Sequence, residues 1–338
     1  MYIRKDDFEI SIYHKEVPEF LIPFLNTIQM QRLKHIGMNC GCEYTDFPLF
    51  RNLQKYSRFQ HSLGTALIVW HFTSDTIQTL AALFHDIATP TFAHTIDFLH
   101  NDYMLQEFTE NATEKIISDS FEISQLLNTM NISIDAVKDY HMYPIADNNS
   151  PRISADRLEY TMGNLWRYGF SDYNTIKQYY DNLIVGEAED GQPELCFQDR
   201  TIAQQFAKDA LRCSKVYISD EDRYAMQILS ELLEVAIQRG VLIESDFMLS
   251  EKEIIDKLEN DKSLNISWRN FRNLYDMVYD ETAPIECRRT IKTKKRYIDP
   301  LVFGNGRISE MDYAFKEMLE DFLKTSQNDW ICGVSRLI

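Results

Sequence analysis

Glycine and proline are scarce in this chain, with 11 and 9 copies among 338 residues. Both shares are well below the averages of roughly 7% and 5%. A chain so poor in turn-forming residues argues against a β-sandwich, a barrel or a propeller, and predicts a mostly helical protein. Hydrophobic residues make up 44% and aromatic residues 12% of the chain, which excludes wholesale disorder and allows a large core.

The chain also lacks a paired cysteine motif and a long apolar run. Of its six cysteines only Cys40 and Cys42 lie close together, so the paired CxxC pattern of a zinc site is absent. No stretch reaches the roughly 18 apolar residues of a membrane span, and the charged first residues lack the apolar core of a signal peptide. We therefore expect a cytoplasmic protein with reduced thiols and no membrane partner.

Positive charge is in short supply as well, because the net charge is −17. Such a surface repels nucleic acid and anionic membranes at long range, which disfavours nucleic acid as a partner. The run 288–296 is an exception, with six cations in nine residues. It suits an anion or nucleotide site, an interface with an acidic partner, or a solvated segment that balances nearby acids, and we favour the last interpretation.

Helical periodicity dominates the first half of the sequence. Apolar residues recur at helical spacing over 19–36, 59–72, 76–87, 109–127 and 153–168. Later, Asp190-Gly191 separates two short apolar runs, which predicts a β-hairpin near 182–198. The helical front half gives way to this hairpin at about 169–181. We therefore expect one domain over 1–175, with its core at about 20–170, and a mostly helical lobe over 176–338 that contains the hairpin.

Two histidines and two aspartates stand in contexts that suggest a shared role. His85 and Asp86 directly follow an apolar run, His61 opens a buried helical pattern, and Asp156 lies in another. Because charged groups are rarely buried unpaired, a carboxylate behind five apolar residues needs a partner. Neighbouring helical residues point about 100° apart, so His85 and Asp86 can share one ion only where the helix ends, and Pro90 places that end nearby. This N/O donor set suits Mn, Fe, Ni, Zn or Mg, although isolated His-Asp dipeptides also occur by chance.

These residues lie in longer motifs that resemble the H…HD…D signature of HD-domain phosphohydrolases. The motifs are Arg58-Phe-Gln-His61-Ser-Leu-Gly64, Leu83-Phe-His85-Asp86-Ile-Ala-Thr-Pro-Thr-Phe92-Ala-His94-Thr-Ile-Asp97 and Ile153-Ser-Ala-Asp156-Arg-Leu-Glu-Tyr160. The resemblance is greatest to the deoxynucleoside triphosphate triphosphohydrolases, including the SAM-and-HD-domain kind, and it is strong over about 20–170.

The resemblance implies an all-α HD-domain fold in which four side chains hold one divalent metal ion, namely His61, His85, Asp86 and Asp156. It also implies hydrolysis at a phosphorus centre by a metal-activated water. The substrate it implies is a nucleotide or another phosphorylated small molecule, and homo-oligomers are frequent in this family.

The chain departs from that branch at positions that handle protons. A histidine usually stands three residues after the aspartate of the HD pair, and Thr89 stands there instead. A second histidine precedes a glutamate on the following helix, and the best match is Thr109-Glu110. The aspartate expected four residues after Tyr160 is Asn164. A threonine hydroxyl cannot replace an imidazole as a proton donor near neutral pH.

Several other motif residues remain candidates for the site. His94 and Glu110 are candidate catalytic residues beside Asp156, and Arg58, Thr89 and Tyr160 are candidate substrate-binding residues. Each also has a structural interpretation: a surface ion pair for Arg58, a core histidine for His94, a solvated charge for Glu110 and plain packing for Tyr160.

We therefore expect a metal-dependent phosphohydrolase that acts on a nucleotide, with a (deoxy)nucleoside triphosphate as the favoured substrate. One alternative is a nucleotide phosphatase or phosphodiesterase with a different leaving group, because a weaker general acid suits a leaving group that needs no proton. The other alternative is a non-catalytic nucleotide or metal sensor, which retained ligands and missing proton donors would also fit.

Overall fold

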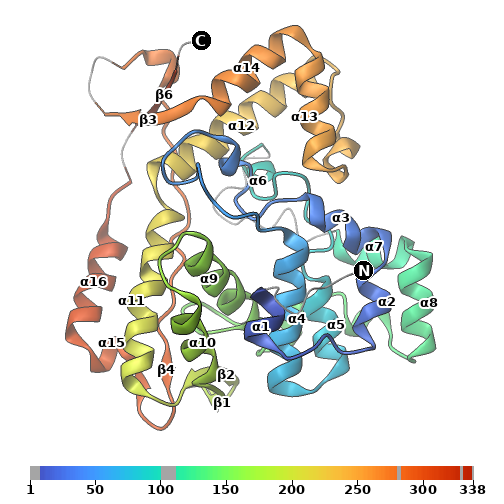
Figure 1. Ribbon diagram of the computed structural model, residues 1–338, viewed down its shortest axis with the longest axis vertical. Helices are drawn as coiled ribbons and strands as arrows, with labels where there is room; N and C mark the ends of the chain where they lie inside the picture. The colour runs from blue at the N-terminus through green and yellow to red at the C-terminus, as the bar shows by residue number, and fades with distance from the viewer. Residues whose placement is uncertain (1–7, 100–111, 280–282, 328–329, 337–338) are drawn as a thin grey trace.

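The structure is a computed structural model that describes residues 8–99, 112–279, 283–327 and 330–336. It is mainly helical with small β-sheets (Figure 1), which confirms the predicted fold class. The helices of the first half are α1 (Phe8–Tyr13), α2 (Leu21–Leu25), α3 (Ile28–Arg32), α4 (Arg58–Thr73), α5 (Thr76–Phe84), α6 (Thr95–Leu99), α7 (Thr113–Asp119), α8 (Phe121–Thr129), α9 (Ala155–Arg167) and α10 (Tyr173–Asp181). Those of the second half are α11 (Arg200–Val216), α12 (Asp220–Gln238), α13 (Glu251–Asn260), α14 (Lys262–Arg272), α15 (Ile308–Met311) and α16 (Tyr313–Lys324).

The strands form two small sheets. They are β1 (Leu183–Glu187), β2 (Pro193–Phe197), β3 (Leu274–Val278), β4 (Leu301–Val302), β5 (Gly306–Arg307) and β6 (Cys332–Ser335). One sheet has the order β1-β2-β4-β5, and the other pairs β3 with β6. The antiparallel pair β1–β2 is the hairpin predicted near 182–198, and Gly191 takes a φ of +79° in its turn.

Helix α4 is the centre of the front half because it is buried nearly all round. It packs against α5, α9 and α1, and its apolar residues join a core cluster that extends to α11 and α16. A second core cluster joins α12, α13 and α14 with α6 and the loop around Phe47. Figure 1 shows α12–α14 with β3 and β6 at the top of the view, above α4, α5 and α9.

Some predicted helices are shorter or interrupted. The pattern over 19–36 is broken into α2, α3 and a 3-10 turn, because Thr27 is extended, with ψ 151°. The pattern over 76–87 stops as a helix at Phe84. The pattern over 109–127 is interrupted at Ser120, whose side chain caps α8 by accepting from Ile123 N. Thr109 and Glu110 lie outside the described residues.

Arg307 joins the β-hairpin to the segment that precedes α9. Its guanidinium forms two-pronged ion pairs with Glu189 and with the fully buried Glu194, with N–O distances of 2.6–3.0 Å, and it also donates to Asp299 O. Glu194 Oε1 in turn accepts from Ile153 N at 3.1 Å. Because α9 begins two residues after Ile153, this network holds the helix end that carries Asp156.

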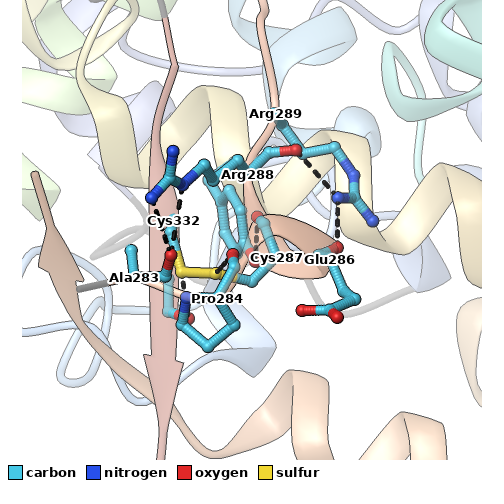
Figure 2. The surroundings of a disulfide bond; sticks show 9 residues. Ala283, Pro284, Glu286, Cys287, Arg288, Arg289 and Cys332 are labelled. Atoms are coloured by element: carbon cyan, nitrogen blue, oxygen red, sulfur yellow. Dashed lines mark hydrogen bonds between the residues drawn. A yellow bond between two sulfur atoms is a disulfide. The ribbon is translucent and has the colours of Figure 1, made fainter. Parts of the chain in front are cut away.

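Two of the six cysteines are bonded to each other. The expectation that all thiols are reduced is wrong for Cys287 and Cys332, which form a disulfide with Cα atoms 5.2 Å apart. Pairing of β3 with β6, and of Arg289 with Ile331, brings the two positions together. Figure 2 shows the disulfide, with the Arg288 guanidinium donating to Ala283 O beside it. The other four cysteines are free and buried.

None of the described helices combines the length and the apolar character needed to cross a bilayer.

Replacing Arg307 with methionine should destabilise the protein, because it leaves the buried Glu194 carboxylate without its guanidinium. We expect a loss of about 3–5 kcal/mol in the free energy of unfolding, measured by urea denaturation. Lys324→Met is the matched control, since Lys324 is 72% exposed in its pair with Glu320, and exposed pairs contribute about 0–1 kcal/mol. Equal losses in the two variants would contradict this role for Arg307.

The disulfide predicts the number of reactive thiols. Protein purified without reductant and then unfolded in guanidinium should react with Ellman's reagent at four thiols per chain, because Cys287 and Cys332 are bonded. Prior reduction should raise the number to six. Six reactive thiols without reduction would show that the pair is open in solution.

Candidate metal centre

Helix ends place the four predicted ligands. His61 lies in the first turn of α4, which a capping box of Ser57 and Gln60 starts. Asp156 lies in the first turn of α9. Helix α5 ends at Phe84, so His85 and Asp86 follow it directly. Neighbouring side chains in a helix point about 100° apart. The sequence predicts that His85 and Asp86 lie at a helix end for this reason, and the structure places them there.

The structure brings His61, His85 and Asp86 together, with ligand atoms that all lie within 4.8 Å of one another, and it places Asp156 beside the two histidines. His61 Nε2 lies 3.0 Å from His85 Nε2 and 3.0 Å from Asp156 Oδ1. Asp86 Oδ2 lies 3.8 Å from His61 Nε2 and 3.7 Å from His85 Nε2. His85 Nε2 is 3.8 Å from Asp156 Oδ1. Atoms that each bind one ion at about 2.1 Å lie roughly 3.0–4.2 Å apart, depending on the angle between them, so these distances fit a shared ion.

Hydrogen bonds at the far side of each imidazole show why a cation fits this point. His61 Nδ1 lies 2.5 Å from the carboxylate of Glu159, and His85 Nδ1 lies 2.7 Å from the carbonyl of Ala82. Both partners are acceptors, so both Nδ1 atoms donate. The two rings therefore turn their Nε2 atoms toward each other, beside the carboxylate oxygens of Asp86 and Asp156, and an uncharged imidazole offers a lone pair at that atom. Such a set of acceptors matches a divalent ion.

Nearby charges keep the two aspartates ionised. Burial raises the pKa of Asp86, but the Arg58 guanidinium at 2.8 Å and the two histidines hold it well below its usual range. Burial likewise raises the pKa of Asp156, and the hydrogen bond and charge of His61 lower it further than burial raises it. The surroundings therefore favour the ionised form of both carboxylates.

Arg58 and Thr89 both line the cavity and both contact Asp86. Arg58 Nη1 binds Asp86 Oδ2, and its Nε atom is buried without a partner among the described residues. Thr89 Oγ1 donates to Asp86 Oδ1 at 2.7 Å. In this structure Thr89 thus orients the Asp86 carboxylate. Contact of either residue with a substrate remains a prediction.

His94 lines the same cavity and is held by a buried carboxylate. Its Nδ1 lies 2.8 Å from Asp97 Oδ2, and Asp97 is fully buried. The chain reaches His94 through Phe92 and Ala93, which take φ values of +63° and +44°. This left-handed conformation costs roughly 1–2 kcal/mol per residue that carries a Cβ. The surrounding packing imposes that strain on the turn that leads to His94.

The cavity beside these residues has a volume of about 180 Å³ and a lining of two kinds. One kind comprises the four candidate ligands with Arg58, Thr89 and His94. The other, which we call the neutral wall, comprises neutral hydrogen-bonding groups, among them Tyr160, Asn164, Tyr168, Tyr217 and Asn39. Two bonds order the neutral wall: Asn164 Nδ2 donates to Tyr217 Oη at 2.8 Å, and Tyr168 Oη donates to Asn39 Oδ1 at 3.1 Å.

Sequence reasoning missed two parts of the site. Glu159 supports His61, and its place one helical turn after Asp156 is a signal that could have found it. Lys294 and Arg296 of the run 288–296 line the cavity with the candidate ligands. Lys294 is exposed and Arg296 is half-buried, so the prediction of a solvated segment stays open for both. Their place beside the cavity could not be read from a local charge pattern.

No protein-family model matches the chain, but it has similar proteins of known name. It is 21% identical to the uncharacterized protein YdhJ of Bacillus subtilis, over 82% of either chain. It is 22% identical to the deoxynucleoside triphosphate triphosphohydrolase SAMHD1 homolog of Dictyostelium discoideum, over 90% of this chain and 67% of that protein. It is 24% identical to the metal-dependent phosphohydrolase cns2 of Cordyceps militaris, over 47% of this chain and 45% of that protein.

The fold has solved counterparts as well. A phosphohydrolase from Bacteroides thetaiotaomicron superposes with a TM-score of 0.61 at 16% identity, covering 95% of this chain and 97% of that one. The chain resembles the HD-domain metal-dependent phosphohydrolases. The convergence of His61, His85, Asp86 and Asp156 fits the signature from which the sequence predicts that resemblance.

Replacing Glu159 with glutamine should weaken metal binding. The change keeps the size of a fully buried side chain but removes the charge that polarises His61. Loss of such a supporting carboxylate lowers metal affinity roughly 10–100-fold. Calorimetric titration of metal-free protein with Mn²⁺ measures it, and Glu122→Gln on the exposed face of α8 is the control. Unchanged affinity in Glu159→Gln would remove Glu159 from the site.

Proposed function

We propose that this protein is a metal-dependent phosphohydrolase that acts on a nucleotide, with a (deoxy)nucleoside triphosphate as the favoured substrate. The observation that carries the proposal is the joint placement of metal-binding groups and cations in one cavity, which also has a neutral hydrogen-bonding wall. The metal-binding groups and the cations suit a phosphate group, and the aromatic and amide side chains of the neutral wall suit a nucleoside. The named relatives support hydrolysis at phosphorus.

His61, His85, Asp86 and Asp156 are the residues that would hold the divalent ion. When bound, such an ion lowers the pKa of a water molecule and polarises a phosphoryl oxygen. Arg58 lies beside Asp86, so its guanidinium can also bind a phosphate oxygen and stabilise the charge that develops there. Tyr160 also lines the cavity, and we expect its side chain to contact the sugar.

His94 is the residue that we assign to proton transfer. Burial lowers the pKa of His94, the Asp97 carboxylate opposes that shift, and the charges of Arg58 and Arg296 add to it. The ring is therefore mostly neutral at neutral pH. Asp97 holds Nδ1 as the donor, so Nε2 is the atom that accepts a proton from the attacking water.

One observation favours a second candidate, a phosphatase or phosphodiesterase with a different leaving group. The Thr89 hydroxyl is committed to Asp86, so it does not donate a proton to a leaving oxygen. A leaving group that needs no proton, such as pyrophosphate or a nucleotide phosphate, suits that arrangement.

Product analysis separates these candidates. Purified protein is incubated with Mn²⁺ and, in turn, with deoxynucleoside triphosphates, nucleoside monophosphates and cyclic nucleotides. We expect the deoxynucleoside triphosphates to yield a deoxynucleoside and tripolyphosphate. Inorganic phosphate or a nucleoside monophosphate would support the second candidate instead. Nucleotide binding without turnover under any divalent metal would support a sensor and overturn both enzymatic proposals.

The Asp156→Ala variant shows whether any turnover belongs to this site. It removes one of two negative ligands, so we expect at least a 100-fold loss of activity together with most of the bound metal. Asp135→Ala is the control, because that side chain is 81% exposed. Activity that survives in Asp156→Ala would come from a contaminating enzyme. Metal content is measured by atomic emission on the same samples.

A further inference from the structure

An extended segment brings cations from the second half of the chain to the cavity. We call residues 288–296 the cationic strap. The strap belongs to the connection that leaves the β3–β6 sheet at the top of the molecule and runs down to β4 (Figure 1). At its upper end the Cys287–Cys332 disulfide ties the connection to β6 (Figure 2). The strap therefore crosses the molecule beside the cavity under restraint.

Several strap residues are anchored away from the cavity. Arg289 forms a two-pronged ion pair with Glu231 of α12, at 2.6 and 2.7 Å. Thr293 exchanges hydrogen bonds with Gln327 through its backbone N, its carbonyl oxygen and its hydroxyl. The ammonium of Lys295 donates to Leu323 O and Thr325 O at the end of α16. These bonds hold the backbone on both sides of Lys294.

Two cations of the strap line the cavity, namely Lys294 and Arg296. Lys292 and Lys294 are both exposed, but Lys292 is not part of the described lining. Within the described part of the chain, Lys294 has neither a hydrogen bond nor an ion pair. Arg296 is half-buried, and its charge acts on both His94 and Tyr160. The strap thus adds two cations to the lining that contains His94 and the candidate metal ligands.

The described lining of the cavity carries charged groups of both signs. Its carboxylates are Asp86, Asp156 and Asp222, and the first two are candidate ligands of a divalent ion. Burial raises the pKa of Asp222 to about 8, so it is mostly uncharged at neutral pH. The same lining carries three cations, Arg58, Lys294 and Arg296, of which Arg58 pairs with Asp86. Several cations in one lining suit a ligand with more than one anionic group.

We propose that Lys294 and Arg296 are specificity residues, which bind the phosphate groups remote from the reaction centre and thereby favour a chain of two or three phosphates over one. The inference rests on the proposed function, because it concerns the substrate of the same cavity. Arg58 would contact the phosphate at the metal centre, and the strap would contact the others through charge-assisted hydrogen bonds.

The test measures binding and does not depend on turnover. Protein purified with its bound metal and freed of excess metal is titrated calorimetrically with orthophosphate, pyrophosphate and tripolyphosphate, at about 0.15 M salt to screen distant charges. We expect wild type to bind tripolyphosphate at least tenfold more tightly than orthophosphate. Lys294→Ala should lose roughly five- to tenfold in tripolyphosphate affinity and change little for orthophosphate. Arg296→Gln should show the same pattern.

Lys292→Ala is the matched control. It removes the same positive charge two positions before Lys294, from a side chain that is not part of the described lining. Equal losses in Lys292→Ala and Lys294→Ala would overturn the proposal, as would equal losses for orthophosphate and tripolyphosphate. Wild-type protein that binds no polyphosphate would also overturn it. Thermal midpoints of all variants identify any that fold poorly.

Nucleotide assays then separate this inference from the proposed function. If the protein hydrolyses nucleotides, Lys294→Ala should lower kcat/KM for a deoxynucleoside triphosphate more than for the monophosphate, and Lys292→Ala should lower neither. If no nucleotide is hydrolysed but the polyphosphate pattern holds, the proposed function fails and the role of the strap stands. If nucleotides are hydrolysed and Lys294→Ala keeps the wild-type preference for the triphosphate over the monophosphate, the proposed function stands and the role of the strap is refuted.

Discussion

Two imidazole Nε2 atoms and two carboxylates converge where α5 ends, and the rest of the site depends on that convergence. A metal ion can bind all four only if each ligand is held in place from behind. Glu159 holds His61, the Ala82 carbonyl holds His85, and Arg58 and Thr89 hold Asp86. The ends of α5 and the beginnings of α4 and α9 are therefore positioned as one unit.

The support extends well behind the ligands. Glu159 accepts from Tyr56 Oη as well as from His61, and the Arg167 guanidinium lies 3.6 Å from the Tyr56 ring. Arg167 also binds Glu9 of α1 at 2.7 Å. All of these side chains are buried, and a buried polar network is stable only when its members stay paired. The first helix of the described chain is thus linked to a candidate metal ligand through a chain of paired charges.

Cations gather at the cavity although the protein as a whole is acidic. A chain with net charge −17 places Arg58, Lys294 and Arg296 in the lining of one concave site, together with three aspartates. Its acidic surface repels polyanions such as nucleic acid at long range. The ligand residues come from the front half of the chain and the strap from the back half, so the complete site exists only in the folded whole.

The sequence by itself determined the features that depend on neighbours along the chain. Helical periodicity, the Asp190-Gly191 turn and the grouping of ligands into short motifs all follow from local geometry. Tertiary structure alone decided which distant groups meet them. Glu159 reaches His61 across 98 positions, Lys294 lines a cavity built mostly by earlier helices, and Cys287 meets Cys332 because β3 pairs with β6. These contacts depend on how whole helices and strands pack, and the residues next to each position in the sequence do not indicate that packing.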